Sequence, residues 1–359
     1  MAPIYSRGVT WHARLSLDYQ PDPHDGGRTL LARTHHGPLV VQKALYPEGP
    51  ALCHTLIVHP PGGIAGGDHL TIAASVAAGA QALVTTPGAT KWYKANGRRA
   101  AQSISLRIDG RLEWLPQEAI VFNQARVCSS IDIALGRQAR TIGWDIVALG
   151  RAAAGETFDD GAFAQTIRLT DASEGDRLQW VERTRIAGSD ALLASPVGLA
   201  GHHVLGCLWA AGHAWRDSEI ETLREQLPPQ AAPITRVAPR LLLARVLATS
   251  TPAARRALHG VWAAVRPLLL GRPAQPPRIW ATKPGCFTRA PPCLDDLPPS
   301  AAAISCTRPK PPWTAGATRV CAALARPSRA RAFADAYGHR LRPSRAIGLA
   351  RASAQIPRP

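Results

Sequence analysis

Short apolar runs bounded by glycine, proline, aspartate or asparagine dominate the chain from residue 10 to about residue 211. Within many of these runs apolar and polar residues alternate, which is typical of strands with one buried face. Clear examples are residues 55–58, 102–108, 131–135 and 177–182. No helical segment of normal length interrupts the region, so alternating strand–helix–strand units are not expected. The pattern predicts a mainly β body built from antiparallel strands.

Helical periodicity begins only after residue 211, and it predicts helices near 218–227, over 240–248 and over 252–270. The last helix carries an apolar stripe at three- and four-residue spacing, formed by Leu258, Val261, Trp262, Val265 and Leu269. We expect this stripe to pack on the sheets, and a partner-binding face is the alternative. Pro267 lacks a backbone donor, so we expect it to bend or end the helix.

Two glycine-rich turns, residues 59–68 and 85–91, lie between apolar runs. The first contains Gly62, Gly63, Gly66 and Gly67, and Asp68 follows directly. Four glycines in six positions indicate a backbone that needs positive φ or lies very close to other atoms. A phosphate-binding loop would need Gly-Lys-Ser/Thr here, and a dinucleotide fingerprint would need glycine where Ile64 stands. We therefore predict a structural turn with a functional carboxylate rather than a nucleotide site.

The net charge of +17 is distributed unevenly. Residues 283–359 carry 13 Lys or Arg against 3 acidic residues, whereas residues 1–282 carry 29 against 22. A mildly basic body suits acidic protein partners as well as nucleic acid. It lacks, however, the basic stripe with interleaved aromatic residues that is typical of a nucleic-acid groove. We expect no nucleic-acid binding, and a basic nucleic-acid-binding protein is the alternative interpretation.

Three features of the sequence favour a cytoplasmic protein. The N-terminus shows no basic region followed by an apolar one, so no signal peptide is expected. The longest apolar stretch, residues 72–84, is too short and too interrupted to span a membrane. Cys53, Cys128 and Cys207 have no paired spacing, which fits buried thiols in a reducing compartment.

The composition changes after Thr282. Residues 283–359 contain 12 Pro and 17 Ala and show no sustained periodicity. Such a segment cannot bury enough apolar surface to offset the entropy of ordering. We predict a folded domain over residues 1–282 and a disordered extension over residues 283–359. The extension is interpreted either as a genuine functional segment or as a frameshifted or read-through addition.

The sequence patterns of common catalytic sites, Gly-x-Ser-x-Gly, His-Glu-x-x-His and Gly-Lys-Ser/Thr, are missing from the chain. A tight metal site is not indicated either. In an extended strand Cys53 and His59 share a face but lie about 20 Å apart at roughly 3.3 Å per residue, and His54 points the other way. We expect a protein that is not an enzyme and that holds no metal tightly.

Four polar residues lie beside the special turns or within apolar strands: Asp68, Thr90, Asp145 and Glu182. Their spacing alone fits turn caps or ion pairs, such as one between Glu182 and Arg183 or Arg185. A second interpretation makes them functional oxygen ligands.

Motifs spread in order along the chain resemble the UreD (UreH) family of urease accessory proteins. They are residues 33–43 and 45–49, the two glycine-rich turns, residues 112–118, 143–145, 149–151, 155–156, 266–272 and 276–280. Together they cover roughly residues 10–282. Glu118, Glu156 and Arg278 lie within these motifs, and we expect structural roles for them.

The resemblance implies a β-helix-like stack of sheets with a small helical part near the end. It implies a non-catalytic metallochaperone scaffold that helps deliver nickel to urease apoprotein. A UreF-type accessory protein would bind it and recruit a UreG-type GTPase, and no membrane would be involved. No cofactor would be tightly bound, but Ni²⁺ would pass transiently. Asp68, Thr90, Asp145 and Glu182 match positions thought to line an internal passage, where oxygen ligands release the ion readily.

Removal of residues 283–359 should leave the protein intact, because that composition does not support a fold. We expect a chain that ends at Thr282 to match the full chain in thermal unfolding and in urease activation. A fall in melting temperature of several degrees, or a loss of activation, would contradict the assignment of this segment.

Overall fold

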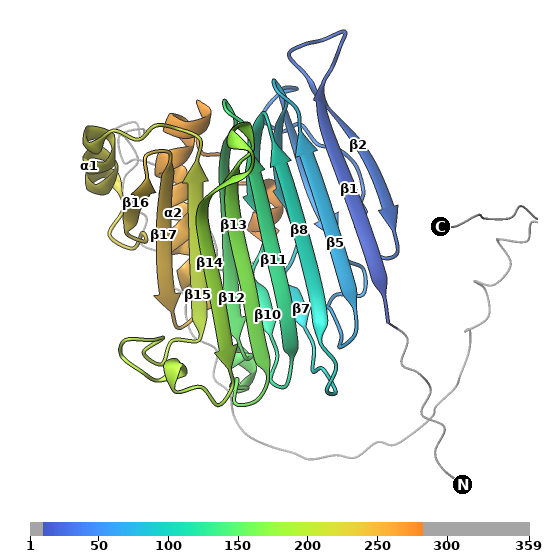
Figure 1. Cartoon of the computed structure of the whole chain (residues 1–359), viewed down its shortest axis with the longest axis vertical. Helices are drawn as coiled ribbons and strands as arrows, with labels where there is room; N and C mark the ends of the chain where they lie inside the picture. Colours follow the sequence, from blue (N-terminus) through green and yellow to red (C-terminus); the bar gives the residue numbers. More distant parts are fainter. Residues whose placement is uncertain (1–9, 283–359) are drawn as a thin grey trace, which may run out of the picture. The chain divides into compact units, whose positions relative to one another are not determined.

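Two large β-sheets face each other in the computed structural model, which describes residues 10–282 (Figure 1). The seven-stranded sheet has the order β14 (Arg177–Ala187), β13 (Ala162–Asp171), β11 (Arg126–Leu135), β8 (Ala100–Ile108), β5 (His69–Val76), β1 (His12–Pro21) and β2 (Thr29–His36). The predicted disordered extension lies outside the described residues.

The ten-stranded sheet has the order β16 (Ile234–Ala238), β17 (Leu241–Ala248), β15 (Val204–Ala211), β12 (Arg140–Leu149), β9 (Arg111–Leu115), β6 (Gln81–Thr85), β4 (Leu52–Val58) and β3 (Val40–Val41). Two short strands complete it, β10 (Ala119–Val121) beside β12 and β7 (Thr90–Trp92) beside β10. The helices are α1 (Asp217–Gln226), α2 (Thr251–Leu270) and the 3₁₀ turns η1 (Ala152–Ala154), η2 (Ala172–Glu174), η3 (Ala191–Leu193) and η4 (Arg278–Thr282).

A mainly β fold with a small helical part is confirmed, but the expected antiparallel pairing is wrong for the central strands. Nine of the fifteen strand pairings in the described residues are parallel. From β4 to β13 the chain passes back and forth between the two sheets. Two parallel neighbours in one sheet are therefore connected through a strand of the opposite sheet, and no crossover helix is needed between them. This is the β-helix-like arrangement.

The predicted helix over 240–248 is also wrong, because residues 241–248 form β17. Leu241 and Leu243 join the apolar core between the two sheets, whereas Leu242 and Ala244 join the core beneath the helices. A strand that is buried on both faces reads as a continuous apolar run and loses its alternation. Its periodicity alone therefore does not separate it from a buried helix.

Helix α2 covers the outer face of the ten-stranded sheet and packs on β12, β15 and β17. Every residue of its apolar stripe is buried. The expectation that the stripe packs on a sheet is confirmed, and the partner-binding alternative is wrong because the stripe has no free surface. Pro267 does not end the helix, which continues to Leu270. Arg111 and Arg140 donate to the final carbonyls of Leu270 and Leu269, at 2.9 and 2.8 Å.

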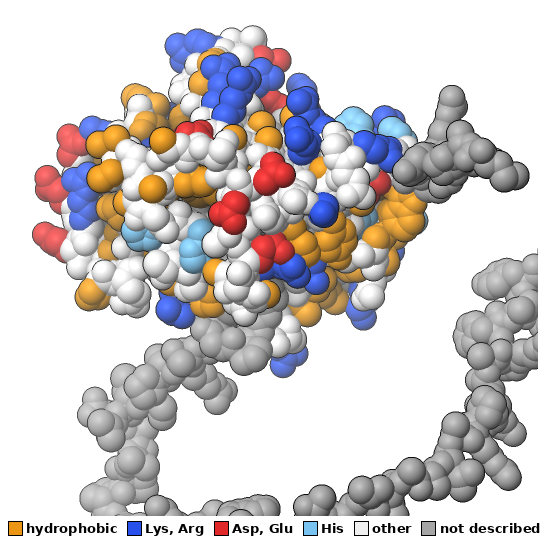
Figure 2. All heavy atoms as spheres, turned by 90° about the horizontal axis from the view of Figure 1, so that it is seen from below, with side chains coloured by type: hydrophobic (Ala, Val, Ile, Leu, Met, Phe, Trp, Pro, Cys, Tyr) orange, Lys and Arg blue, Asp and Glu red, His pale blue; other side chains and the backbone are white. Residues whose placement is uncertain are grey.

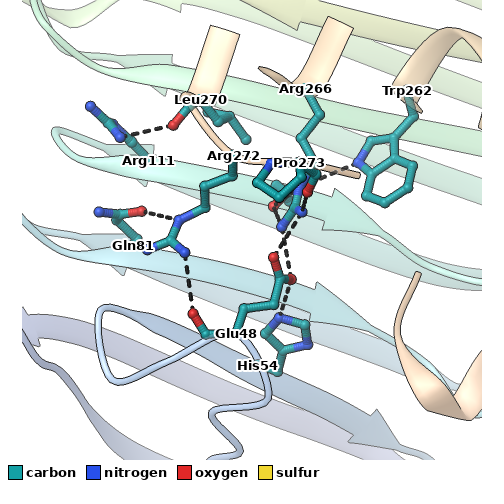
Figure 3. A network of polar contacts seen from close by, with 10 residues as sticks. Glu48, His54, Gln81, Arg111, Trp262, Arg266, Leu270, Arg272 and Pro273 are labelled. Atoms are coloured by element: carbon teal, nitrogen blue, oxygen red, sulfur yellow. Dashed lines mark hydrogen bonds and ion pairs between the residues drawn. The ribbon is translucent and has the colours of Figure 1, made fainter. Parts of the chain in front are cut away.

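A buried charge network ties α2 to the sheet (Figure 3). Arg266 is 0% exposed and donates to Glu113 on β9 at 2.9 Å and to Glu48 at 2.8 Å. Trp262 donates its indole N–H to Glu113 at 2.8 Å, and His54 lies 3.0 Å from Glu48. Burial opposes the ionisation of Glu48, yet the hydrogen bonds from His54 and Arg266 hold its pKa below the ordinary value. The guanidinium of Arg266 thus links α2 to Glu48, which lies more than 200 positions away in the sequence.

The substitution Arg266→Met should lower the free energy of unfolding by about 3–5 kcal/mol, because it leaves two carboxylates buried without their cation. Chemical denaturation measures this loss. The matched control is Arg168→Met, which removes an exposed ion pair with Asp132 and should cost no more than about 1 kcal/mol. Equal effects of the two substitutions would show that the network does not hold the helix.

Candidate functional site

The two glycine-rich turns lie against each other. The N–H of Ile64 donates to the carbonyl of Lys91 at 2.7 Å, and the N–H of Tyr93 donates to the carbonyl of Ile64 at 2.9 Å. Thr90 begins β7, and its N–H donates to the carbonyl of Glu118 at 2.9 Å. Backbone hydrogen bonds therefore join the end of the second turn to the first turn on one side and to Glu118 on the other.

The four glycines of the first turn serve two different purposes. Gly62 and Gly67 have positive φ values of 76° and 101°, which L-residues with a Cβ rarely adopt. A Cβ on Gly63 would lie 2.4 Å from the Tyr93 ring, and one on Gly66 would lie 2.2 Å from the Ala95 carbonyl. Positive φ and close approach, the two reasons for glycine that the sequence suggested, are both present. The close approach packs the first turn against residues 91–95.

Asp68 caps this turn. Its carboxylate accepts from the N–H of Trp11 at 3.0 Å and from the N–H of Ala65 at 2.9 Å, and the residue is 8% exposed. These bonds join the glycine turn to the start of β1. Asp68 does not belong to the lining of either of the two cavities described next.

The larger cavity has a volume of about 530 Å³ and lies beneath both turns. Its wall includes Gly62 and Gly63 from the first turn, Thr90 from the second, and Glu118 and Asp145. Glu118 is buried and forms an ion pair with the buried Arg255 of α2. The negative charge of Glu118 is thus already balanced.

A second cavity of about 390 Å³ lies between β13 and β14 on one side and β12, β15 and β17 on the other. It is lined by Asp145, Glu182, Cys207 and Arg245 among others. Glu182 accepts from Arg245 at 3.1 Å across the gap between the sheets, so the suggested pairing with Arg183 or Arg185 is wrong. Those two arginines are exposed, while Glu182 faces the cavity.

Asp145 belongs to the walls of both cavities. Its side chain leaves β12 toward the seven-stranded sheet, where Gln165 of β13 donates an amide N–H to it at 2.9 Å. Burial raises the pKa of Asp145, and the hydrogen bond from Gln165 opposes that rise only in part. In contrast to Glu118 and Glu182, Asp145 has a neutral amide rather than a cation as its side-chain partner.

Comparison with known proteins gives a consistent answer. A family model described as "UreD urease accessory protein" matches residues 12–281. A urease accessory protein UreD of Ralstonia nicotianae is 46% identical over 286 residues, which cover 76% of this chain and 95% of that protein. A protein of the same name from Pseudomonas fluorescens Pf0-1 is 48% identical over 276 residues, with 76% and 96% covered.

The chain belongs to the UreD urease accessory protein family. Membership in this family supports a role in urease maturation rather than in catalysis. In residues 10–282, no three His, Cys, Asp or Glu side chains are grouped so that they could hold a metal ion. Among the same residues, no helix combines the length and the apolar character needed to cross a membrane.

The other UreD motif residues lie at turns and contacts. Glu156 forms an ion pair with Arg151, whose Nε lies 3.0 Å away, and accepts from the N–H of Asn123 at 2.9 Å. Arg278 begins η4 and is exposed, while Trp280 of the same turn is buried. Structural roles for Glu118 and Glu156 agree with these contacts.

Sequence reasoning missed Gln165 and Arg245 and noted Cys207 only as a buried thiol. Arg245 is the one charged residue in the apolar run 241–248, and that isolation was the available signal. Because the run was predicted to be a helix, Arg245 was not considered as a residue that lines the space between the sheets. Gln165 carries no signal in a single sequence, because only the packing of the two sheets brings it to Asp145.

The close approach at the glycine turn predicts a large difference between two similar substitutions. Gly66→Ala places a Cβ against backbone, so it should lower the free energy of unfolding by about 1–3 kcal/mol. Gly88→Ala is the matched control, because a Cβ at Gly88 meets nothing within 4 Å and its φ is not positive. Thermal unfolding of both variants measures the difference, and similar stabilities would show that the turn adapts freely.

Proposed function

We propose that this chain is a nickel-delivery scaffold in urease maturation, and that Ni²⁺ travels through the two cavities past Asp145 on its way to urease apoprotein. One observation carries the proposal. Asp145 is the lining residue common to both cavities, and within residues 10–282 its carboxyl group is paired with the neutral amide of Gln165 and with no cation.

Charge balance explains why a cation would follow this route. A buried carboxylate is costly unless something neutralises it. Glu118 is neutralised by Arg255 and Glu182 by Arg245, whereas Asp145 forms no ion pair within residues 10–282. A divalent ion in either cavity would supply the missing positive charge.

The same arrangement suits transfer better than storage. Oxygen ligands hold a first-row divalent ion less tightly than several imidazoles or thiolates do. Thr90 and Asp145 belong to the wall of the larger cavity, and their side chains carry oxygen ligands only. Nickel would therefore be bound transiently, as cargo of the protein rather than as a resident cofactor.

Asp68 has a different place in this proposal. Its two backbone hydrogen bonds make it a turn cap, and it also lies near His59, whose pKa is lowered by burial and raised in part by the charge of Asp68. We assign Asp68 to the shape of the turn above the larger cavity. The alternative is that Asp68 contacts the passing ion directly. The substitution Asp68→Asn, described below, distinguishes the two roles.

The partners follow from the family. We propose that a UreF-type accessory protein binds this chain, that a UreG-type GTPase joins through it and brings nickel, and that urease apoprotein receives the ion. The mildly basic composition of residues 1–282 suits acidic protein partners. The face shown in Figure 2 carries Lys and Arg side chains together with acidic and apolar ones. The nucleic-acid alternative rests on net charge alone, most of which lies in residues 283–359.

The substitution Asp145→Asn tests the passage. Asparagine keeps an acceptor for Gln165 but removes the charge, so the nickel content of matured urease should fall at least about fivefold. The accessory complex should still assemble in a pull-down. Because the folded protein raises the pKa of Asp145, ionisation costs stability as pH rises, and the variant should gain stability over the parent as pH increases. Normal nickel loading would refute the passage.

Asp68→Asn separates a turn cap from a passage residue. Asparagine accepts only one of the two backbone N–H groups well, so the variant should lose about 1–3 kcal/mol of unfolding free energy. Urease matured by the fraction that assembles should carry normal nickel. Low nickel in fully assembled complexes would instead place Asp68 in the ion path.

A further inference from the structure

Residues of β14 and β17, one strand from each sheet (Figure 1), line the second cavity. β14 is an edge strand of the seven-stranded sheet. Glu182 on β14 and Arg245 on β17 meet there, with side chains that are 26% and 52% exposed. Two nitrogens of the guanidinium contact the two carboxylate oxygens, which is the bidentate geometry of a strong arginine–carboxylate pair. The ion pair thus stands at the solvent side of the cavity and spans both sheets.

Arg245 also lies in line with Asp145. Across the ten-stranded sheet, Asp145 is in register with Cys207, and Cys207 is in register with Arg245. Residues in register on neighbouring strands share a face, so the three side chains form one row along the cavity. Two strand spacings separate the ends of the row, which is about 10 Å. Burial raises the pKa of Cys207 to about 12, so its thiol adds no charge to the row.

The row has a cation at its solvent end and an anion at its inner end. A cation that moves between Asp145 and the solvent side beside Arg245 is repelled by the positive charge of Arg245. Glu182 faces the same cavity but is engaged by Arg245, so it offers little attraction to a second cation. The pair therefore closes this end of the cavity electrostatically without filling it.

We propose that Arg245 is an electrostatic gate at the opening of the second cavity, held closed by Glu182. The inference rests on the proposed nickel passage and adds its control point. When the guanidinium turns away, Glu182 and Asp145 become two carboxylates on one path for a divalent cation. Arg245 is half exposed, so an anionic group on a docked protein can compete with Glu182 for its five donors.

Opposite effects of two substitutions distinguish a gate from a purely structural ion pair. Arg245→Met removes the repelling charge and frees Glu182, so the full chain with its accessory partners should retain Ni²⁺ at least about fivefold more tightly in equilibrium dialysis. Glu182→Gln leaves Arg245 without its counter-charge, so retention should fall below that of the parent. A structural pair would move both variants in the same direction, because each loses the same contact.

Three further proteins complete the experiment. The double variant Arg245→Met with Glu182→Gln should return to the retention of the parent. Arg245→Lys keeps the charge and should stay closer to the parent than Arg245→Met does, although lysine cannot form the bidentate contact. If Arg245→Met fails to fold, a fall in retention with Glu182→Gln still tests the gate. The control Arg168→Met breaks an exposed ion pair between β13 and β11 and should leave nickel retention unchanged.

The outcomes separate the gate from the passage. Equal nickel retention by the parent, Arg245→Met and Glu182→Gln would overturn the gate, as would a change of the same sign in both variants. The passage is judged independently, by the nickel content of urease matured with Asp145→Asn. A gate that fails while Asp145→Asn lowers nickel loading would leave the passage intact and remove only its control point.

Discussion

The cost of a buried charge organises this structure. Arg266 lies between α2 and the ten-stranded sheet, and it is stable there because Glu113 and Glu48 surround its guanidinium. That compensation fixes the helix, and the fixed helix brings Arg255 to Glu118 at the wall of the larger cavity. Asp145 is the contrasting case, because the fold places this carboxylate between two sheets and gives it an amide. A site that must accept and release a cation needs such an incompletely balanced charge.

The path of the chain explains how two cavities come to meet at one residue. From β4 to β13 the chain passes back and forth between the sheets, so strands that follow one another along the chain contribute residues to both walls of the interior. Most of those positions are apolar and form the core between the sheets. Around Asp145, Gln165, Cys207 and Glu182 they are polar instead, and the interior stays open. The glycine-rich turns form part of the wall of the larger cavity. The first turn can lie close to residues 91–95 because its glycines have no Cβ.

Local features of the fold were predictable from the sequence, and long-range ones were not. Alternation identified segments of β4, β8, β11 and β14, the stripe from Leu258 to Leu269 identified α2, and clustered glycines identified the turn before Asp68. Strand direction was missed because it depends on which sheet each strand joins. β17 was read as a helix because both of its faces are buried. The partner of Glu182 was missed because Arg245 is 63 positions away and on the other sheet.

The central claim is that a divalent cation is held beside Asp145, where the two cavities meet. Anomalous diffraction at the nickel absorption edge tests it directly, with crystals of the accessory complex soaked in a nickel salt. The account predicts an anomalous peak next to the Asp145 carboxylate that disappears in crystals of the Asp145→Asn variant. Nickel peaks confined to surface histidines, with none in either cavity at saturating nickel, would contradict it.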